Sequence, residues 1–498
     1  MEQNVSKTTL HFPQARCRTG VARVDVTPPV GIYHRMWGAA KHDQATGVHR
    51  PLTATVLTMR SLTESDPGLV MIALDHCLLW GQEMSAFLDA VSLQAEVDRG
   101  SILTFFSHTH AAGLMGLERT GLPGGDRIPA YLDELATQTT AAIREALSGE
   151  TSSLLSFGTG HCDLAQNRDY FDAQAGHYVC GFNPDGPADD AVVVAKVVEE
   201  DSGRTTATIV NYACHPTTLA WDNTLISPDY VGSMREVIET ATNAPCLFIQ
   251  GASGDIGPRD GFVGDVEIAD RNGRQLGYAA AATLERLVVA ARDPGNSTAV
   301  CAAQMSYTGA VLSGATIGTW QTQAVEKERA ASLARWRFRE TTVELPFRED
   351  LVTREQLEQQ CSHWQAAEQA ACQAGHAAEA ADARAMVERM TRRLVRVRDL
   401  PAGRTYAFQI RIWRFGDVVW VVLEGEHYNV LQRRIRESFP DVAIVVASLV
   451  NGSVCWYLPD EQAYGKGLYQ EDASVLAQGS LETLTAAIIE QITAILEE

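Results

Sequence analysis

Two histidines that follow an apolar run are the residues of this sequence with the clearest capacity for chemistry. Residues 102–106 are apolar, as in a buried strand, and Ser-His-Thr-His follows at 107–110. At strand spacing, His108 and His110 face the same side of a sheet. Two neutral imidazoles and one carboxylate are the usual ligands of a catalytic zinc ion. The pattern suggests a metal site, although H-x-H alone also fits a hydrogen-bonded pair of strand-end histidines.

The same arrangement recurs at four other apolar runs, each of which leads into a side chain that can bind a metal or move a proton. These runs and the residues after them are 207–212 before His215, 246–249 before Asp255, 418–423 before Glu426, and 443–447 before Tyr457. Ligand sites in α/β sheets lie outside the carboxyl ends of the strands, where loops bring distant parts of the sequence together. We therefore expect these five strand ends to meet at one site.

The elements that would hold such a site alternate along the chain. The apolar runs are rich in Val, Ile and Phe and are bounded by Gly, Asn or Pro, as buried strands are. Helical patterns lie between several of them, at 131–147, 230–240 and 271–290, and one more closes the chain at 481–496. Strands that alternate with helices predict an α/β fold with a mixed or parallel sheet flanked by helices.

One segment has a different composition. Residues 353–398 are rich in Ala, Glu, Gln and Arg and are interrupted by Gly375. These properties predict a helical hairpin with Gly375 near the turn. We expect one catalytic domain over residues 1–498, with this hairpin as an insertion at about 350–400. The insertion either covers the cleft and selects substrates, or is a packed hairpin without a role in catalysis.

Composition and charge argue against several classes of protein. An apolar fraction of 45% is that of a globular protein, and the formal net charge of −21 disfavours nucleic acid and anionic membranes as partners. We see no signal peptide and no apolar run that could span a membrane, so we expect a cytoplasmic protein without stable membrane insertion. The ten cysteines are scattered without a C-x-x-C pair, which is typical of reduced thiols.

Nearly the whole chain resembles the catalytic domain of the neutral/alkaline non-lysosomal ceramidases. The resemblance is carried by motifs in the family's order: GVARVDVTPPVG at 20–31, ATGVHRPL at 45–52, SHTH at 107–110, NR at 167–168, NYACHPT at 211–217, GD at 254–255, GE at 425–426, WY at 456–457 and YQ at 469–470. These motifs are specific as a set rather than singly. Animal and bacterial members carry a further C-terminal β-sandwich domain, which we do not expect in this chain.

The resemblance implies a role for each residue that matches. It implies one catalytic Zn²⁺ with four ligands, which are His108, His215, Glu426 and Tyr457. It also implies that His110 lies beside the metal or contacts the oxyanion, that Arg168 binds substrate, and that Tyr469 is a second active-site tyrosine. Phenols ionise near pH ~10 in water, so Tyr457 either binds zinc with a lowered pKa or stays protonated and hydrogen-bonds the oxyanion.

The chain departs from the ceramidases at the position of their proposed nucleophile. Where the family has a serine between Gly-Asp and Pro, this sequence has Gly257, which has no side chain to attack with. Ser253 is near in sequence, but its surroundings lack the final glycine of the G-x-S-x-G elbow. The sequence therefore favours direct attack by a zinc-activated water, with His110 or Asp255 as the general base.

The expected reaction is hydrolysis of a carboxamide, with a small-molecule amide or N-acyl compound as the binding partner. The acidic composition and the expected cytoplasmic location favour an amide that is smaller or more soluble than ceramide. Two alternatives stay open: a zinc-dependent esterase or lactamase that uses the same residues, and a degenerate homologue that binds a lipid or amide without cleaving it. The sequence does not determine the oligomeric state, and a homo-oligomer is compatible with it.

Overall fold

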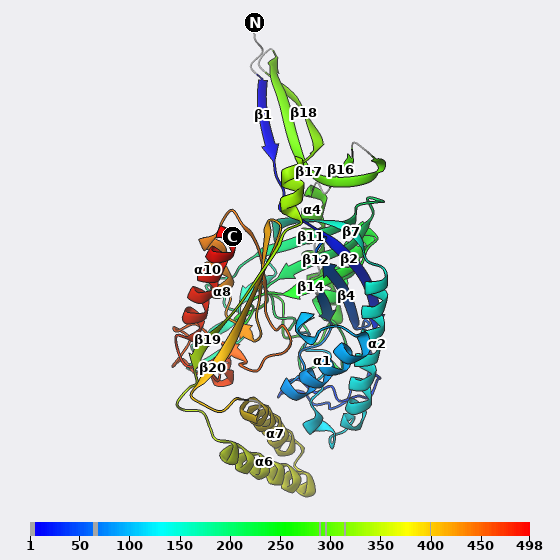
Figure 1. The fold of residues 1–498 in the computed structure, drawn as a ribbon. Helices are drawn as coiled ribbons and strands as arrows, with labels where there is room; N and C mark the ends of the chain where they lie inside the picture. Colours follow the sequence, from blue (N-terminus) through cyan, green and yellow to red (C-terminus); the bar gives the residue numbers. More distant parts are fainter. Residues whose placement is uncertain (1–4, 63–67, 288–289, 294–295, 313–314, 399) are drawn as a thin grey trace.

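The chain folds into four layers, in the order helices, sheet, sheet, helices (Figure 1). The computed structural model describes residues 5–62, 68–287, 290–293, 296–312, 315–398 and 400–498. Parallel and antiparallel strands are mixed within both large sheets. The α/β class predicted from the sequence is therefore confirmed.

The larger sheet has eight strands, and the loops that carry the predicted site residues follow strands at or next to its two edges. In spatial order the strands are β14 (Cys246–Gln250), β12 (Thr205–Tyr212), β11 (Ala191–Glu199), β7 (Thr151–His161), β2 (Gln14–Asp25), β4 (Thr53–Arg60), β5 (Leu69–Leu74) and β6 (Ile102–Phe106). The pairs β12–β14 and β5–β6 are parallel, and the pairs between them are antiparallel. The edge strands β14 and β6 also come close to each other.

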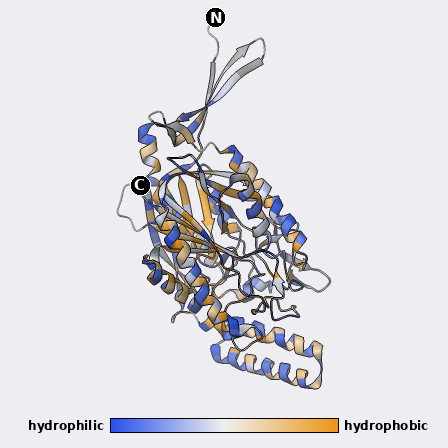
Figure 2. Cartoon of the chain, turned by 90° about the vertical axis from the view of Figure 1, so that its right-hand side faces the viewer, coloured by the Kyte–Doolittle hydropathy of each residue, from blue (hydrophilic) through white to orange (hydrophobic). Residues whose placement is uncertain are grey.

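A second, four-stranded sheet packs face to face on the first. Its order is β19 (Trp336–Pro346), β20 (Thr405–Phe415), β21 (Val418–Val422) and β23 (Ala443–Ala447), of which β21 and β23 are parallel. The two inner faces share one core, in which Phe105 from the first sheet meets Trp420 from the second with ring centroids 6.4 Å apart. Figure 2 shows the hydrophobic colouring concentrated on these inner strands. The sheets are thus fixed to each other, which matters because both supply site residues.

Helices cover the outer face of each sheet. The larger sheet is covered by α1 (Gly81–Ala95), α2 (Ile128–Ser148), α3 (Tyr230–Thr242) and α4 (Val266–Arg286), and the smaller one by α8 (Val430–Ser438) and α10 (Ser480–Glu497). The helical pattern predicted over 271–290 ends earlier, at Arg286, because the backbone of Leu287 is already extended. Short elements connect these layers. They are α5 (Lys327–Leu333), α9 (Tyr469–Ala473), β3 (Gly47–Val48), β8 (Ala165–Asn167), β9 (Asp169–Asp172), β10 (His177–Cys180), β13 (Leu225–Ile226), β15 (Ile256–Pro258), β22 (Glu426–His427) and β24 (Tyr457–Leu458).

The predicted helical hairpin is present as α6 (Arg354–Ala374) and α7 (Ala377–Arg398). Gly375 ends α6 in the left-handed conformation, with φ of 73°, as expected for the residue at this turn. The hairpin projects from the end of the body opposite the chain termini (Figure 1). It is attached through Glu388 of α7, whose carboxylate accepts from Tyr33 Oη at 2.5 Å and from Arg119 Nη2 at 3.1 Å.

A second projection lies at the other end of the molecule (Figure 1). It is a small antiparallel sheet of β1 (Val5–Leu10), β16 (Ala290–Asp293), β17 (Asn296–Leu312) and β18 (Ala315–Ala324). The sequence interpretation did not include it, because alternation in these strands is weak and Gly, Ser and Thr are frequent in them.

Two sequence expectations about the environment of the chain can be compared with the fold. All ten cysteines are free thiols. Within the described residues, no helix is both long enough and apolar enough to cross a membrane.

Candidate metal centre

The ends of strands from both sheets meet at one buried cluster. His108 follows β6 of the larger sheet by two residues, and His215 follows β12 of the same sheet by three. Glu426 lies in β22, just after β21 of the smaller sheet, and is paired in parallel with Tyr457 of β24. The side chains of His108, His215 and Glu426 are at most 4% exposed.

One segment joins the strand ends to each other. After β23, the backbone N–H of Ser448 donates to the carbonyl oxygen of Gln250 at the end of β14. Three residues later, Asn451 bonds to the opposite edge strand: its side chain accepts from Thr104 N–H at 2.7 Å and donates to the Ile102 carbonyl oxygen at 2.8 Å. Residues 448–451 thus connect both edges of the larger sheet to the smaller one, at the level of the cluster.

Three ligand atoms in the cluster lie at nearly equal separations. The Nε2 atoms of His108 and His215 are 2.9 Å apart, and the Oε2 atom of Glu426 is 3.2 Å from the first and 3.3 Å from the second. Tetrahedral zinc with bonds of about 2.0–2.1 Å would separate its ligand atoms by about 3.3 Å. The triangle therefore has the dimensions of one face of a zinc coordination sphere.

The orientation of both imidazoles is set by backbone carbonyl groups. The Nδ1 atom of His108 lies 2.7 Å from the carbonyl oxygen of Cys77, and that of His215 lies 2.9 Å from the carbonyl oxygen of Ser253. Since a carbonyl oxygen can only accept, each Nδ1 carries the hydrogen, and in a neutral ring Nε2 is then a lone pair. Two lone pairs and a carboxylate thus converge. A proton can bridge one of the three contacts, whereas a divalent cation satisfies all of them.

The backbone at His108 is also specialised. Its φ is 67°, in the left-handed region that a non-glycine residue rarely adopts. Such a conformation costs on the order of 1–3 kcal/mol and persists where the surroundings impose it. Here the N–H of His108 donates to the His76 carbonyl oxygen at 2.8 Å. The strained residue turns the imidazole from the strand end into the cluster.

The charges of the cluster depend on one another. Burial would raise the pKa of the Glu426 carboxyl, but His108 and His215 hold that pKa well below its usual range. Burial lowers the pKa of His215 to about 3. Burial also opposes a charge on His108, yet Cys77 and Glu426 raise its pKa well above the usual range. A cation-free cluster therefore draws a proton to His108, and a metal ion would compete with that proton for the same nitrogen.

The fold can be compared with known structures at this point. Comparisons with protein-family models and with curated sequences give no match. The chain is similar to the solved structure of neutral ceramidase from Pseudomonas aeruginosa, with a TM-score of 0.62 and 13% identity over 96% of this chain and 74% of that one. A second solved structure, a ceramidase complexed with C2, gives a TM-score of 0.60 at 13% identity, with the same coverage. The chain has the fold of a neutral ceramidase.

On this ceramidase fold, two more of the predicted residues lie against the cluster. The hydroxyl of Tyr457 is 3.3 Å from His215 Nε2 and accepts a hydrogen bond from Arg168 Nη2 at 3.1 Å. Burial raises the pKa of Tyr457 well above its usual value. The hydroxyl is close enough to the cluster for either of the two roles that the sequence left open, zinc ligand or hydrogen-bond donor to the oxyanion. Arg168 is fixed in turn by two bonds to the Gly254 carbonyl oxygen, at 2.7 and 3.2 Å.

His110 and Tyr469 lie at the rim. The ring of His110 is 4.9 Å from that of His108 and 5.3 Å from that of His215, and its Nδ1 donates to the His108 carbonyl oxygen at 2.9 Å. Its other nitrogen is therefore a hydrogen-bond acceptor. Tyr469 is 45% exposed and packs edge-on against Tyr457, with ring centroids 5.8 Å apart. Both residues are thus adjacent to the cluster, and His110 also belongs to a second group of possible metal ligands, with Cys77 and His108.

The structure does not join Asp255 to the cluster. Its two carboxylate oxygens accept from the N–H of Asn429 at 2.6 Å and from Asn167 Nδ2 at 3.2 Å. Burial raises its pKa to about 7, but among the described residues no hydrogen bond links it to His108, His215 or Glu426. The sequence interpretation put Asp255 in the site because a glycine-rich turn follows its strand, and that turn instead carries the Ser253 and Gly254 carbonyl groups inward.

Position 257 has room for a side chain. A Cβ atom built on Gly257 would lie 3.5 Å from Thr217 Oγ1 and 3.6 Å from Arg168 Cδ, which are ordinary contacts. Ser253, the nearest serine, accepts from Gln250 Nε2 at 2.6 Å and is 3% exposed. The missing nucleophile is thus not imposed by packing, and Ser253 is held in the turn.

An aromatic cluster beside His110 was not foreseen. The ring of Trp37 lies 5.4 Å from that of His110, 6.2 Å from Trp221 and 5.8 Å from Phe262. The Trp37 indole nitrogen is buried and has no hydrogen-bond partner in the described part of the chain, and Phe262 has a φ of 58°. These residues belong to loops that are far apart in sequence, where no periodic pattern could mark them. Together they form an apolar wall next to the metal candidates.

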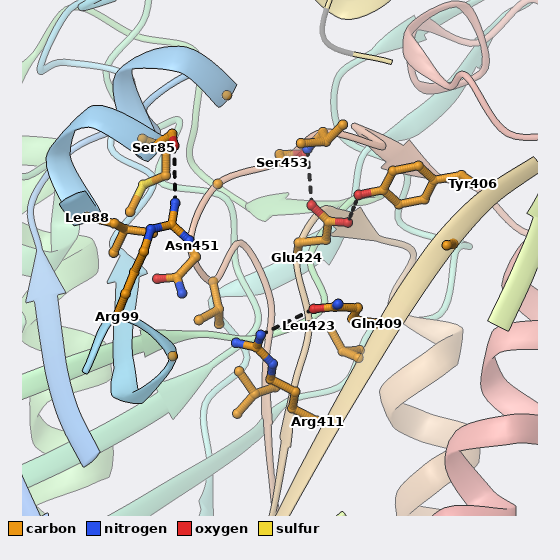
Figure 3. Close-up of a pocket in the computed structure, with 18 residues that line it drawn as sticks. Ser85, Leu88, Arg99, Tyr406, Gln409, Arg411, Leu423, Glu424, Asn451 and Ser453 are labelled. Atoms are coloured by element: carbon orange, nitrogen blue, oxygen red, sulfur yellow. Dashed lines mark hydrogen bonds between the residues drawn. The ribbon is translucent and has the colours of Figure 1, made fainter. Parts of the chain in front are cut away.

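A separate pocket of about 360 Å³ lies behind the segment that joins the strand ends (Figure 3). It is bordered by α1, β20 and residues 450–454, and includes Arg99, Arg411 and Glu424. Glu424 accepts from Tyr406 Oη and, at 3.3 Å, from Val454 N–H. None of the three candidate metal ligands lines this pocket, so it is distinct from the cluster.

Proposed function

We propose that this chain is a zinc-dependent hydrolase that cleaves a carboxamide (N-acyl) bond. The observation that carries the proposal is the convergence of two imidazole lone pairs and one carboxylate, whose ligand atoms lie within 3.3 Å of one another. Two nitrogen ligands and one oxygen ligand fit zinc, and three protein ligands leave a position open for chemistry. When bound, the ion would polarise a carbonyl group and lower the pKa of a water molecule.

The residues around the cluster have complementary tasks in this proposal. Nε2 of His110 accepts a proton from the attacking water. The Tyr457 hydroxyl, whose oxygen already accepts from Arg168, donates to the oxygen atom on which negative charge develops. The aromatic wall of Trp37, Trp221 and Phe262 excludes water on the His110 side and contacts the apolar part of an acyl group.

The type of bond is inferred from the fold and from the motifs. The two solved structures reported above are ceramidases by name, and a ceramide is an N-acyl compound. The motifs at 107–110, 211–217 and 456–457 resemble those of the ceramidases and contain His108, His215 and Tyr457. We propose a smaller or more soluble amide than ceramide, in keeping with the acidic composition of the chain.

Metal analysis combined with turnover tests the proposal. Purified protein is expected to contain about one zinc per chain and to hydrolyse N-acyl amides faster than matched esters relative to their uncatalysed rates. Chelation should abolish turnover and lower the melting temperature, because a ligand that binds only the folded state stabilises it. His215→Ala should lose both metal and turnover, by at least about 1000-fold, since the ligand triangle is broken.

His161→Ala is the matched control, because that imidazole is exposed and its ion pair is with Asp190, outside the cluster. It should keep both metal and activity. A protein without bound divalent metal that hydrolyses no amide after zinc is added would refute the proposal. Turnover of esters alone would assign the same centre to an esterase.

A further inference from the structure

Within the described residues, two buried arginines near the candidate metal centre form no ion pair with a carboxylate. Among the arginines that are at most 6% exposed, Arg35, Arg119, Arg235 and Arg384 each form an ion pair. Arg168 and Arg396 form none within the described residues, although they are 3% and 5% exposed. Burying an unpaired guanidinium is costly, so two of them at one place call for an explanation.

Arg396 comes from the helical hairpin and reaches the metal centre through Trp456. Its guanidinium carbon lies 4.4 Å from the centre of the Trp456 ring. The carbonyl oxygen of that same residue accepts from the N–H of Glu426 at 2.8 Å, and the next residue along the chain is Tyr457. The hydroxyl groups of Tyr457 and Tyr469 are among the electrostatic neighbours of Arg396.

Arg168 approaches Tyr457, the residue after Trp456, from another element. Its guanidinium carbon is 5.9 Å from the centre of the Tyr457 ring, and its Nη2 donates to the Tyr457 hydroxyl at 3.1 Å. The two arginines thus bracket Trp456 and Tyr457, one on each residue.

The nearby acids are already engaged. Asp472 is the carboxylate whose charge acts most strongly on Arg396, and it is already bound by Arg389 and Arg393. Near Arg168, Asp169 accepts from Tyr428 and Gln470, and Asp255 accepts from Asn429 and Asn167. Among the residues that the structure describes, the buried Nε atom of Arg396 has no hydrogen-bond partner, and its side chain borders a cavity of about 200 Å³ beside Asp472 and Val475.

We propose that Arg396 and Arg168 form an anion subsite beside the metal centre, and that the amide substrate carries a carboxylate near its scissile bond. This inference rests on the proposed function and names its substrate class. A guanidinium donates two parallel hydrogen bonds to a carboxylate, and such charged bonds are about twice as strong as neutral ones. The helical hairpin then has a task, because it supplies one of the two cations.

Matched substrates test the subsite. N-octanoylglycine and N-octanoylethanolamine share the acyl chain and the amide, and differ in a carboxylate against a hydroxymethyl group. Wild type is expected to show kcat/KM about 10- to 100-fold higher for the glycine compound, as one or two charged hydrogen bonds would give. Arg396→Gln should reduce this ratio to about 1, mainly through KM, and Arg396→Lys should retain part of it.

Arg354→Gln is the control, because Arg354 lies on the other helix of the hairpin, is 67% exposed and forms its ion pair with Glu358 rather than with Asp472. It should keep the wild-type ratio. Equal kcat/KM for both compounds in wild type, or an Arg396→Gln variant that lowers both by the same factor, would overturn the subsite while leaving the amide hydrolase intact.

A binding measurement separates this inference from the proposed function. Calorimetric titration of chelator-treated protein with the same two compounds reports recognition without turnover. Wild type should bind the glycine compound at least about 10-fold more tightly than the ethanolamine compound. Arg396→Gln should bind the two compounds with equal affinity. If neither compound is hydrolysed but this difference is present, the subsite stands and the hydrolase proposal fails. If the difference is absent, the subsite is refuted.

Discussion

Two backbone carbonyl oxygens decide what the cluster of His108, His215 and Glu426 can bind. By accepting from Nδ1 of each imidazole, the carbonyl groups of Cys77 and Ser253 leave both Nε2 atoms as lone pairs directed at the carboxylate. Hydrogen bonds of this kind orient metal-binding histidines and raise their basicity. Because these contacts are made by backbone carbonyl groups, which every residue has, no sequence motif marks them.

A serine can be placed at position 257 to test whether the nucleophile of the family is needed. Because a Cβ there makes ordinary contacts, we expect Gly257→Ser to change the free energy of unfolding by less than about 1 kcal/mol. Turnover should stay dependent on metal and show no burst of released amine, since attack is by water. Denaturant titration and pre-steady-state kinetics measure the two effects.

Gly273→Ser is the contrasting variant. A Cβ at Gly273 would overlap Ser233 Oγ and the Tyr230 carbonyl oxygen, where α4 crosses α3. We expect a loss of about 3 kcal/mol in the free energy of unfolding from this overpacking.

A burst of released amine in Gly257→Ser, with the size of one turnover per chain, would contradict the prediction and show that an acyl-enzyme route is available to this fold.

At the scale of elements, residues 448–451 are what holds strand ends from two sheets at one point. The segment bonds to β14 through Ser448 and to β6 through Asn451, whose own φ is 57°. The hairpin of α6 and α7 also joins distant elements, because Glu388 of α7 bonds to Arg119 and Arg396 near the end of α7 packs on Trp456. Both are connections between elements that are distant in sequence.

Asn451→Ala tests the role of this segment. The change removes two hydrogen bonds to β6 and places alanine in a left-handed conformation, so we expect a loss of about 3 kcal/mol in the free energy of unfolding. Because His108 follows the same strand by two residues, zinc affinity should fall by about 10-fold or more, as measured by competition with a chelator.

Asn243→Ala serves as the comparison, because Asn243 is also left-handed, with φ of 52°, and ends α3 away from the cluster. It should lose stability without losing zinc affinity. Unchanged zinc affinity in Asn451→Ala would mean that the cluster is held together without this segment.

At the scale of the whole molecule, burial makes stability depend on pH in opposing ways. Burial lowers the pKa of His34 to about 4 and raises that of Asp229 to about 6. In the unfolded chain His34 would bind a proton below about pH 6.5, whereas in the folded protein it stays neutral down to about pH 4. Its contribution to stability is therefore complete above pH 6.5 and is lost as the pH falls towards 4. Asp229 has the opposite sign over part of that range.

The contribution of His34 can be isolated by substitution. A pKa shift of this size corresponds to about 3 kcal/mol. Between pH 6.5 and 4, the free energy of unfolding of wild type should therefore fall by about 3 kcal/mol more than that of His34→Gln. Gln can still donate to the Ala111 carbonyl oxygen that His34 Nε2 contacts at 3.1 Å. Urea unfolding at several pH values measures the difference, and parallel pH profiles of the two proteins would contradict it.

What the sequence determined by itself is local. Apolar runs such as 102–106 and 246–249 are strands because their length and β-branched content favour that state, and residues 353–398 form two helices that meet at Gly375 for the same kind of reason. The rule that ligands gather at the carboxyl ends of strands led us to expect His108, His215, Asp255, Glu426 and Tyr457 at one site, and the resemblance to the ceramidases implied which four of them bind zinc.

The tertiary structure alone decided which side chains meet and how they are oriented. Asp255 follows a strand as the others do, yet its carboxylate bonds to Asn429 and Asn167, because the turn that carries it points its carbonyl groups towards the cluster. Trp37 and Arg396 arrive from distant loops and helices. Contacts of this kind depend on packing between layers and on backbone hydrogen bonds, which every residue can form and which therefore leave no trace in the pattern of residue types.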